Sequence, residues 1–172
     1  MSSSHIQARE EDVLTELLEA LYSGRKDRVA ELLADDPELT VFEAAALGRD
    51  ARLAQLLGED PPSANAFGDD GFQPLGLACF FGHVESARLL LASGADPNTL
   101  ARNEHIQTSA LHAAAASENT TPEARYELCE LLLDHGADPN LPQPGGFRAI
   151  DAARQNGDER LERLLVERGA ER

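Results

Sequence analysis

The chain has 172 residues, of which 42% are hydrophobic, and its 31 acidic and 15 basic residues give a formal net charge of −16. This length and apolar content predict one folded domain with a core of its own, and exclude a disordered chain. The negative charge argues against general binding to DNA or RNA and to anionic membranes, because neutralising phosphates requires basic residues. Two interpretations of the charge stay open, solubility of the chain or attraction of a partner with a basic surface.

Residues 1–10 are polar and without pattern, and we expect them to form a flexible tail. They contain no apolar core for a signal peptide, and no later run approaches the length of a membrane-spanning helix. The two cysteines, Cys79 and Cys129, form neither a CxxC pair nor a disulfide framework. We therefore expect a cytoplasmic protein in a reducing environment, with both thiols as small core residues.

From residue 12 onward the chain repeats one arrangement, which is helix, Gly, helix and turn. The most complete copy runs from Asp70 to Asn98, with Pro74 at the start of one helix and Gly94 just after the second. Neither short helix can bury its apolar face alone, so the copies are expected to stack. We predict a single domain over residues 11–172, divided approximately into repeats 12–36, 37–65, 66–98, 99–140 and 141–172.

The third and fourth copies resemble ankyrin repeats, whose pattern is roughly DGxTPLHxAAxxGHxxVVxLLLxxGADxN. The fourth copy keeps Leu111-His112, Ala114 and Gly136-Ala137-Asp138. The third copy matches the pattern at Asp70, Gly71, Pro74, Leu75, Ala78, Gly82, His83, Leu89 to Leu91, Gly94 to Asp96 and Asn98. The resemblance, over about residues 12–170, implies an all-α fold, an ankyrin-type helical solenoid of five stacked helix-turn-helix repeats with β-hairpin-like connecting loops.

The repeats differ in length. One Leu near the end of each second helix marks the repeat; these residues are Leu32, Leu56, Leu90, Leu132 and Leu165. The spacing from Leu32 to Leu56 is short, whereas the spacing from Leu90 to Leu132 is long. The short spacing predicts that a short turn joins the first two helix pairs. The long spacing contains extra residues after Asn98 and within Ser117–Arg125, where Thr121-Pro122 resembles an N-cap followed by Pro at the first helical position.

Repeat three also departs from the TPLH segment of the family pattern. Gln73 and Gly76 stand where the pattern has Thr and His, so the hydrogen-bonded helix start is expected to be weaker there. Ser109 and His112 can still supply it in repeat four. The resemblance therefore predicts a difference between two neighbouring repeats.

Nothing in the sequence nominates a catalytic centre. No GxSxG, P-loop or dinucleotide fingerprint is present, and the carboxylates are scattered over the predicted helix surfaces. The histidines have no Cys or carboxylate partners at metal-binding spacing and are interpreted as structural; they are His5, His83, His105, His112 and His135. We therefore expect no enzymatic activity, no cofactor and no metal.

The aromatic residues are more informative. The resemblance implies that the two positions before each inter-helix Gly, and the hairpin tips, face a concave groove. Of six Phe, all but Phe42 fall at groove or hairpin positions, and exposed clusters of aromatics are typical anchors at interfaces. We expect Phe80 and Phe81 to be exposed, whereas Phe72 and Phe147 suit packing between hairpins equally well. The candidate partner-binding residues are Tyr22, Leu47, Phe67, Phe72, Phe80, Phe81, Arg102, His105, Gln155 and Asn156.

The expected function is protein–protein recognition through the concave groove and the hairpin tips. We expect a monomer that binds a protein partner, and neither nucleic acid nor a membrane. One alternative is a regulatory or accessory subunit, which would co-purify with a single stoichiometric enzyme. Another is a hydrolase, which requires a cluster of titratable side chains in a pocket.

Overall fold

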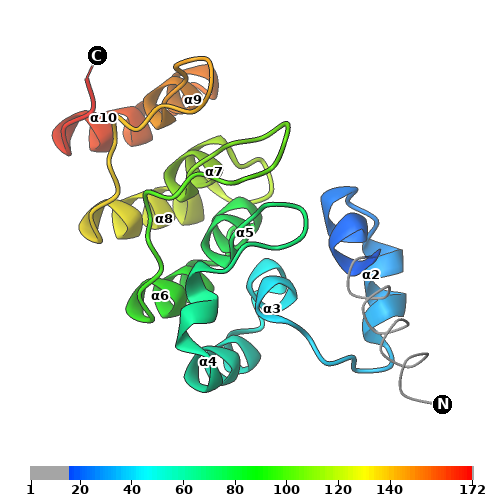
Figure 1. The fold of residues 1–172 in the computed structure, drawn as a ribbon. Helices are drawn as coiled ribbons and strands as arrows, with labels where there is room; N and C mark the ends of the chain where they lie inside the picture. Colours follow the sequence, from blue (N-terminus) through cyan, green and yellow to red (C-terminus); the bar gives the residue numbers. More distant parts are fainter. Residues whose placement is uncertain (1–15, 172) are drawn as a thin grey trace.

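The computed structural model describes residues 16–171. The chain forms helices that follow one another in antiparallel pairs (Figure 1). The expected tail, residues 1–10, and the start of the first repeat lie outside these residues. No strand occurs within them, and the predicted all-α solenoid is confirmed. Over the same residues, no helix combines the length and the apolar character that crossing a membrane requires.

The described helices form five pairs. The first pair consists of residues 16–22 and α2 (Lys26–Leu33), and residues 34–40 lead from it to the second pair. The second, third, fourth and fifth pairs are α3 (Val41–Leu47) with α4 (Asp50–Glu59), α5 (Pro74–Phe81) with α6 (Val84–Ala92), α7 (Ala110–Ala116) with α8 (Pro122–Asp134), and α9 (Ala149–Gln155) with α10 (Glu159–Glu167). A short 3-10 helix, η1 (Pro61–Asn65), follows α4.

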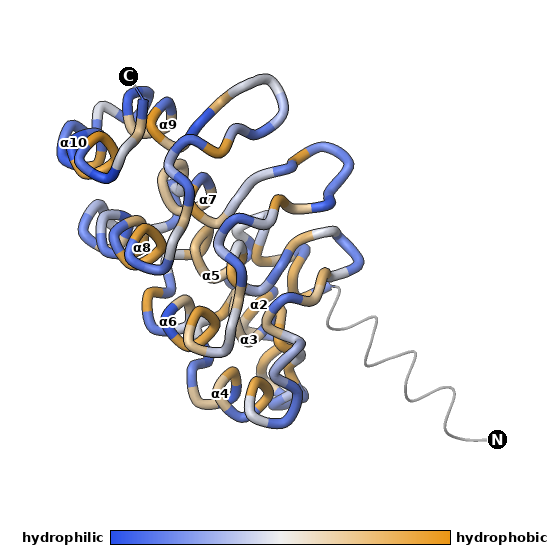
Figure 2. Tube along the Cα trace, turned by 60° about the vertical axis from the view of Figure 1, so that its left-hand side comes forward, coloured by the Kyte–Doolittle hydropathy of each residue, from blue (hydrophilic) through white to orange (hydrophobic). Residues whose placement is uncertain are grey.

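The pairs stack so that their first helices form one row and their second helices another. Helices α3, α5, α7 and α9 contact each other in order, as do α4, α6, α8 and α10 (Figure 1). The loops between pairs project from the side of the first row, and Figure 2 shows them as largely hydrophilic. The row of first helices therefore forms the floor of a surface that the loops flank.

Small residues in the first helices and Leu in the second ones build the core. Ala78, Ala114 and Ala153 are fully buried, which lets neighbouring helices approach closely. The period-marking residues Leu90 and Leu132 are fully buried as well. Cys79 in α5 and Cys129 in α8 are free and buried. The prediction that both are small core residues is confirmed.

The helix starts follow the predicted pattern. In repeat four the Ser109 hydroxyl accepts a hydrogen bond from the backbone N–H of His112 at 3.3 Å. Thr121 likewise caps α8 by accepting from the N–H of Ala124 at 3.2 Å, with Pro122 in the first turn. Gln73 makes no such bond at the start of α5. The expected weakening of the TPLH segment in repeat three is confirmed.

Three asparagines form a ladder between repeats. The side-chain amide of Asn98 donates to the carbonyl of Gly136 at 2.9 Å, and its oxygen accepts from the N–H of Asp138 at 2.7 Å. The same two bonds join Asn65 to Gly94 and Asp96, and Asn140 to Gly169 and Glu171. Each asparagine therefore holds the end of the following helix pair and the turn after it.

The loop of residues 99–109 rests on the turn of residues 68–72. The N–H of Arg102 donates to the carbonyl of Gly71 at 2.8 Å, and the Asn103 side chain donates to the carbonyl of Asp70 at 2.8 Å. Gly71 has φ +82°, and a Cβ there would lie 2.5 Å from the backbone nitrogen of Asn103. Glycine is required at this position because the two backbones approach so closely.

Candidate protein-binding groove

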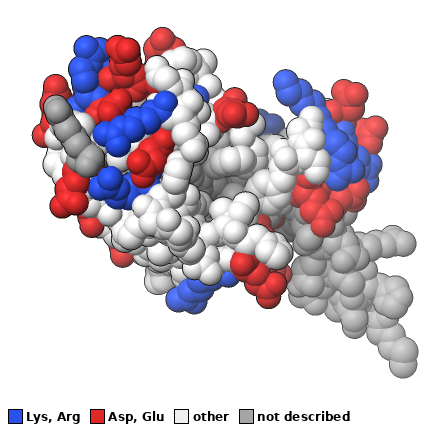
Figure 3. Space-filling view, turned by 90° about the horizontal axis from the view of Figure 1, so that it is seen from above, with Lys and Arg blue, Asp and Glu red and all other residues white. Residues whose placement is uncertain are grey.

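A groove of about 550 Å³ lies on the side from which the loops project. Its floor comes from α5, α7 and α9, and residues of the loops 99–109 and 141–148 line its sides together with Tyr22 and Phe72. Figure 3 shows the hollow bordered mostly by uncharged side chains, with acidic side chains near its rim and the densest charge, of both signs, toward the two ends of the stack. The volume falls in the range of about 300–1,000 Å³ that is usual for ligand-binding clefts.

The floor of the groove is made of small residues. Gly76 of α5, Ala113 and Ala116 of α7, and Ala152 of α9 all line it. A Cβ added at Gly76 would meet no neighbouring atom within 4 Å. The groove is therefore hollow because its floor lacks side-chain volume, and not because the helices are far apart.

Aromatic rings form one side of the groove. Tyr22 is 40% exposed and Phe80 is 38% exposed, and both line the groove. The Tyr22 ring lies 6.1 Å from that of Phe72 and 6.0 Å from that of Phe81, between centroids. Phe80 meets Phe81 edge-on at 5.0 Å. The rings make one continuous cluster, to which the first and third repeats both contribute.

Phe81 differs from the expectation that it would be exposed. It is half-buried, because its ring stacks on Tyr22 at an interplanar angle of 23°. Phe80 is exposed as expected. The backbone carbonyl of Phe80 accepts a hydrogen bond from the Ser117 hydroxyl, in the longer segment of repeat four, which holds the end of α5 in place. The two neighbouring rings therefore have different surroundings.

Asn103 shapes the loop of residues 99–109. Its side-chain oxygen accepts from the N–H groups of His105 at 2.9 Å and of Ile106 at 3.0 Å, while its amide holds Asp70. This bonding folds the tip of the loop so that His105 and Ile106 line the groove. Ile106 is 53% exposed, and it shares the groove with the exposed side chains of Tyr22 and Phe80.

Burial shifts the pKa of two groups that line the groove and of one thiol in the core. Burial raises the pKa of Tyr22, and the hydrogen bond to Asp70 raises it further. Burial lowers the pKa of His112, whose Nε2 lies 2.9 Å from the carbonyl oxygen of Phe147. Burial raises the pKa of Cys129 to about 12, so this thiol is not a nucleophile at neutral pH. Among residues 16–171, no group of three His, Cys, Asp or Glu side chains is placed to hold a metal ion.

The structure brings together four of the residues predicted from the sequence, because Tyr22, Phe72, Phe80 and His105 all line the groove. Phe81 packs against the rings of Tyr22 and Phe80. The other candidates lie elsewhere: Arg102 stacks on Phe67 at 3.8 Å, Leu47 packs against the core, and Gln155 and Asn156 are exposed at the end of α9.

Sequence reasoning missed Ile106, Asn103 and the small floor residues. Ile106 is a lone apolar residue in the polar run Arg102–Gln107, and that isolation is a signal that could have identified it. The sequence shows Gly76 at the position of the pattern His. Whether that glycine leaves a gap in the floor of the groove depends on which side chains surround it, and the sequence does not give these. Asn103 had no sequence signal, since its bonds depend on the neighbouring turn.

Comparisons with known proteins agree with this architecture. A model of the family described as ankyrin repeat matches residues 70–103 and 107–143. The chain is 32% identical over 104 residues to the ankyrin repeat protein YahD of Escherichia coli, a stretch that covers 60% of this chain and 49% of that protein. It is 39% identical over 85 residues to cyclin-dependent kinase 4 inhibitor B of Mus musculus, which covers 47% of this chain and 56% of the relative.

A third relative is the ARF GTPase-activating protein GIT1 of Homo sapiens. The identity is 37% over 86 residues, and the match covers 50% of this chain but 10% of that protein. The aligned stretch therefore spans about half the length of the first two relatives, and a small part of this third one.

Proposed function

We propose that this chain, in which residues 70–103 and 107–143 match the ankyrin repeat family, binds a protein partner through the groove and the loop tips beside it. Ankyrin repeats are in general protein–protein interaction modules. One observation carries the assignment to the groove. Among the described residues the exposed large hydrophobic side chains are Tyr22, Phe80 and Ile106, and all three line it.

The position of these side chains supports a binding role over a packing role. Their exposed apolar surface lies in one concave site, which Phe80 of α5 and Ile106 of the 99–109 loop both line. Burying such anchors against a partner removes apolar area from water, and a few buried anchors usually supply most of the affinity. Neither Phe80 nor Ile106 belongs to the hydrophobic core of the stack, which consists of other residues.

Site-directed photo-crosslinking tests this proposal. A photoreactive amino acid replaces His105, which lines the groove, and in a matched control it replaces Arg163 on α10 at the end of the stack. In extracts of the source cell, the His105 probe is expected to crosslink a defined protein that the Arg163 probe does not capture. The double variant Phe80→Ala/Ile106→Ala should abolish this product. A folded double variant that retains it would contradict the proposal.

A second candidate function is a regulatory subunit of an enzyme. The mouse relative is named as an inhibitor of a cyclin-dependent kinase, and the matched stretch spans about half of this chain. The two functions differ in the partner: native mass spectrometry of the purified complex would show one stoichiometric enzyme for a regulatory subunit, and several partners for a general interaction module.

We further infer that the chain is a monomeric binding protein without catalysis of its own. The net charge of −16 opposes association of copies with one another. Burial raises the pKa of Cys79 and Cys129, which makes both thiols poor nucleophiles. Their free state supports a reducing compartment such as the cytoplasm. Sedimentation of the purified chain tests the oligomeric state.

A further inference from the structure

The floor of the groove has an unfilled position at Gly76. In repeat four the corresponding residue is His112, whose imidazole is 3% exposed and contacts the Phe147 carbonyl at 2.9 Å. In repeat three the glycine leaves this space without a side chain, and a Cβ there would meet nothing within 4 Å. Thr108, which corresponds in sequence to Phe147, and Leu77 both line the groove beside the gap. The gap is therefore a site for a side chain from outside.

The surroundings of this gap are apolar. Leu75, Leu77, Phe80 and Ile106 line the same groove as Gly76. A polar side chain placed there would lose its hydration without gaining a matched set of hydrogen bonds. The gap therefore favours a bulky apolar side chain, which gains free energy from leaving water.

The charges around the groove have one sign. Its lining includes the carboxylate of Asp96 and contains neither Lys nor Arg. Two further exposed carboxylates flank it: Asp69 is next to the residue that binds Tyr22, and Glu104 lies between the groove residues Asn103 and His105. Among residues 16–171, none of these three carboxylates forms an ion pair with Lys or Arg.

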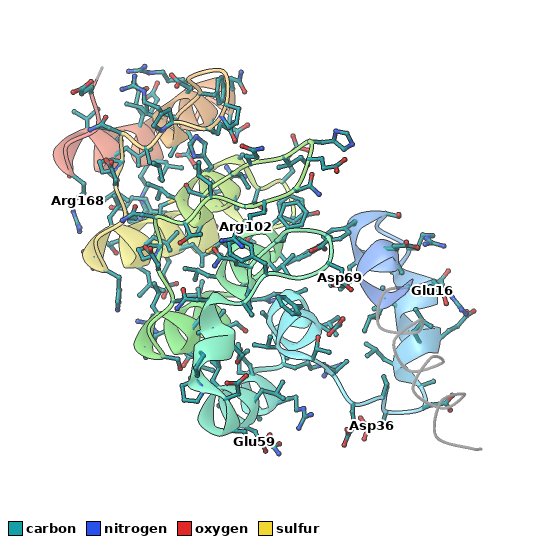
Figure 4. The ribbon with its side chains drawn as sticks, viewed as in Figure 1. Glu16, Asp36, Glu59, Asp69, Arg102 and Arg168 are labelled. Atoms are coloured by element: carbon teal, nitrogen blue, oxygen red, sulfur yellow. The ribbon has the colours of Figure 1, made fainter. Side chains whose placement is uncertain are left out.

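Arg102 is the basic residue of the 99–109 loop, and its guanidinium stacks on Phe67. The guanidinium of Arg102 lies 3.8 Å above the centroid of the Phe67 ring, and Figure 4 shows Arg102 set back from the tip of the neighbouring turn, where Asp69 lies. The carboxylates of Asp69, Asp96 and Glu104 therefore outnumber this one guanidinium at the groove mouth, and a ligand there meets a net negative charge. That charge favours a basic ligand and disfavours a second copy of this acidic chain.

We propose that the groove binds an extended segment of a partner protein in which a bulky apolar side chain fills the gap over Gly76 and a neighbouring Lys or Arg faces Asp69 and Glu104. This assignment rests on the proposed function, because it names the class of partner for the same groove. The apolar anchor supplies affinity, and the acidic mouth selects a basic neighbour and speeds association.

Selection from a displayed library of short random peptides tests the proposal with the full chain as bait. The selected peptides are expected to share a Leu, Ile, Phe or Trp beside a Lys or Arg. For a synthetic peptide from this set, Gly76→His should raise the dissociation constant by roughly tenfold or more, because the new imidazole occupies the gap. Gly76→Ala, which adds one methyl group, should raise it less.

The charges are tested with the same peptide. Asp69→Asn and Glu104→Gln should each weaken binding at low ionic strength, with a smaller effect at high salt, because exposed charges are screened. Glu167→Gln on α10 is the matched control and should leave binding unchanged. Circular dichroism verifies that each variant is folded, and Gly76→Leu replaces Gly76→His if the latter is not.

The outcomes separate the inference from the proposed function. If the peptides lose binding in Phe80→Ala but not in a folded Gly76→His or Gly76→Leu, the gap is not the anchor site and the inference is wrong, while groove binding stands. Selection of acidic peptides, or dimers of the chain that block peptide binding, would also overturn it. If no selected peptide depends on Phe80, Ile106 or Gly76, both proposals fail.

Discussion

The phenolic hydroxyl of Tyr22 donates a 2.7 Å hydrogen bond to Oδ2 of Asp70, which is 48 residues further along the chain. The same ring contacts Phe72 and Phe81. Tyr22 thus attaches the first helix pair to the turn of repeat three while it lines the groove. A residue predicted as a binding anchor therefore also has a structural role.

This bond leads to a prediction for Tyr22→Phe, which keeps the ring contacts and removes the hydroxyl. We expect the free energy of unfolding to fall by about 0.5–1.5 kcal/mol, the usual net contribution of one hydrogen bond. Urea unfolding followed by circular dichroism measures the change. Tyr126→Phe is the matched control, because that ring lies under Arg160 in another part of the stack. Equal stability of wild type and Tyr22→Phe would show that the hydroxyl contributes nothing.

Two glycines should respond in opposite ways to alanine. Gly76→Ala places a methyl group in open space within α5 and is expected to raise the free energy of unfolding by about 0.5–1 kcal/mol, because Gly is unfavourable inside helices. Gly82→Ala should lower the free energy of unfolding by more than about 1 kcal/mol. Gly82 has φ +83°, and a Cβ there would clash with the Thr120 side chain. Thermal unfolding of both variants gives the two signs. A stabilised Gly82→Ala would contradict the left-handed turn.

The asparagine ladder predicts a graded response at Asn98. Asn98→Ala removes both bonds to the next repeat and should lower the free energy of unfolding by about 1–3 kcal/mol. Asn98→Asp retains the acceptor for the Asp138 N–H but places a carboxylate oxygen beside the Gly136 carbonyl, so its loss should be smaller at acidic pH, where the protonated carboxyl can donate, than near neutral pH. Chemical denaturation at both pH values measures the two variants. An Asp variant with the same loss at both would show that the donor contributes nothing.

Substitution of a buried leucine in the row of second helices should lower the free energy of unfolding more than loss of one hydrogen bond does. Leu132 is fully buried in α8, and Leu132→Ala should cost about 2–5 kcal/mol, as expected for a large-to-small change in a core. In a linear stack, that loss also weakens the repeats on both sides. Leu133→Ala, at a half-buried neighbour, is the control and should cost less. Hydrogen exchange would show whether α6 and α10 lose protection together with α8.

Two buried histidines predict a pH dependence of stability. Burial lowers the pKa of His83 and of His112, although bonds to backbone carbonyls and nearby Asp50 and Asp151 oppose the shift. Below the ordinary value of about 6.5, the unfolded chain then binds more protons than the folded chain, so the free energy of unfolding should fall between pH 7.5 and pH 5.5.

Substitution separates this effect from that of other groups. The double variant His83→Gln/His112→Gln should show a flatter pH dependence than the wild type. Glu43 acts in the opposite sense, because burial raises its pKa above the ordinary value of 4.5; comparison of variants at each pH removes its contribution. An unchanged slope in the double variant would rule out the histidines as its source.

The sequence by itself determined the repeat register, the helix starts and the core. Ser109, Thr121 and Pro122 act within one turn of chain, and Leu90 and Leu132 follow a helical period, so both signals are local. It also directed attention to Tyr22, Phe72, Phe80 and His105, because the repeat pattern assigns positions to the concave side.

Only the tertiary structure decided how those positions meet. Phe81 is half-buried because Tyr22, from two repeats earlier, stacks on it, and the wall of the groove exists because Asn103 holds its loop against Asp70. The gap over Gly76 likewise depends on what the neighbouring repeat brings to that place. These contacts join residues far apart in the chain, and their distances are set by how the repeats stack and how the loops fold, which local sequence signals do not encode.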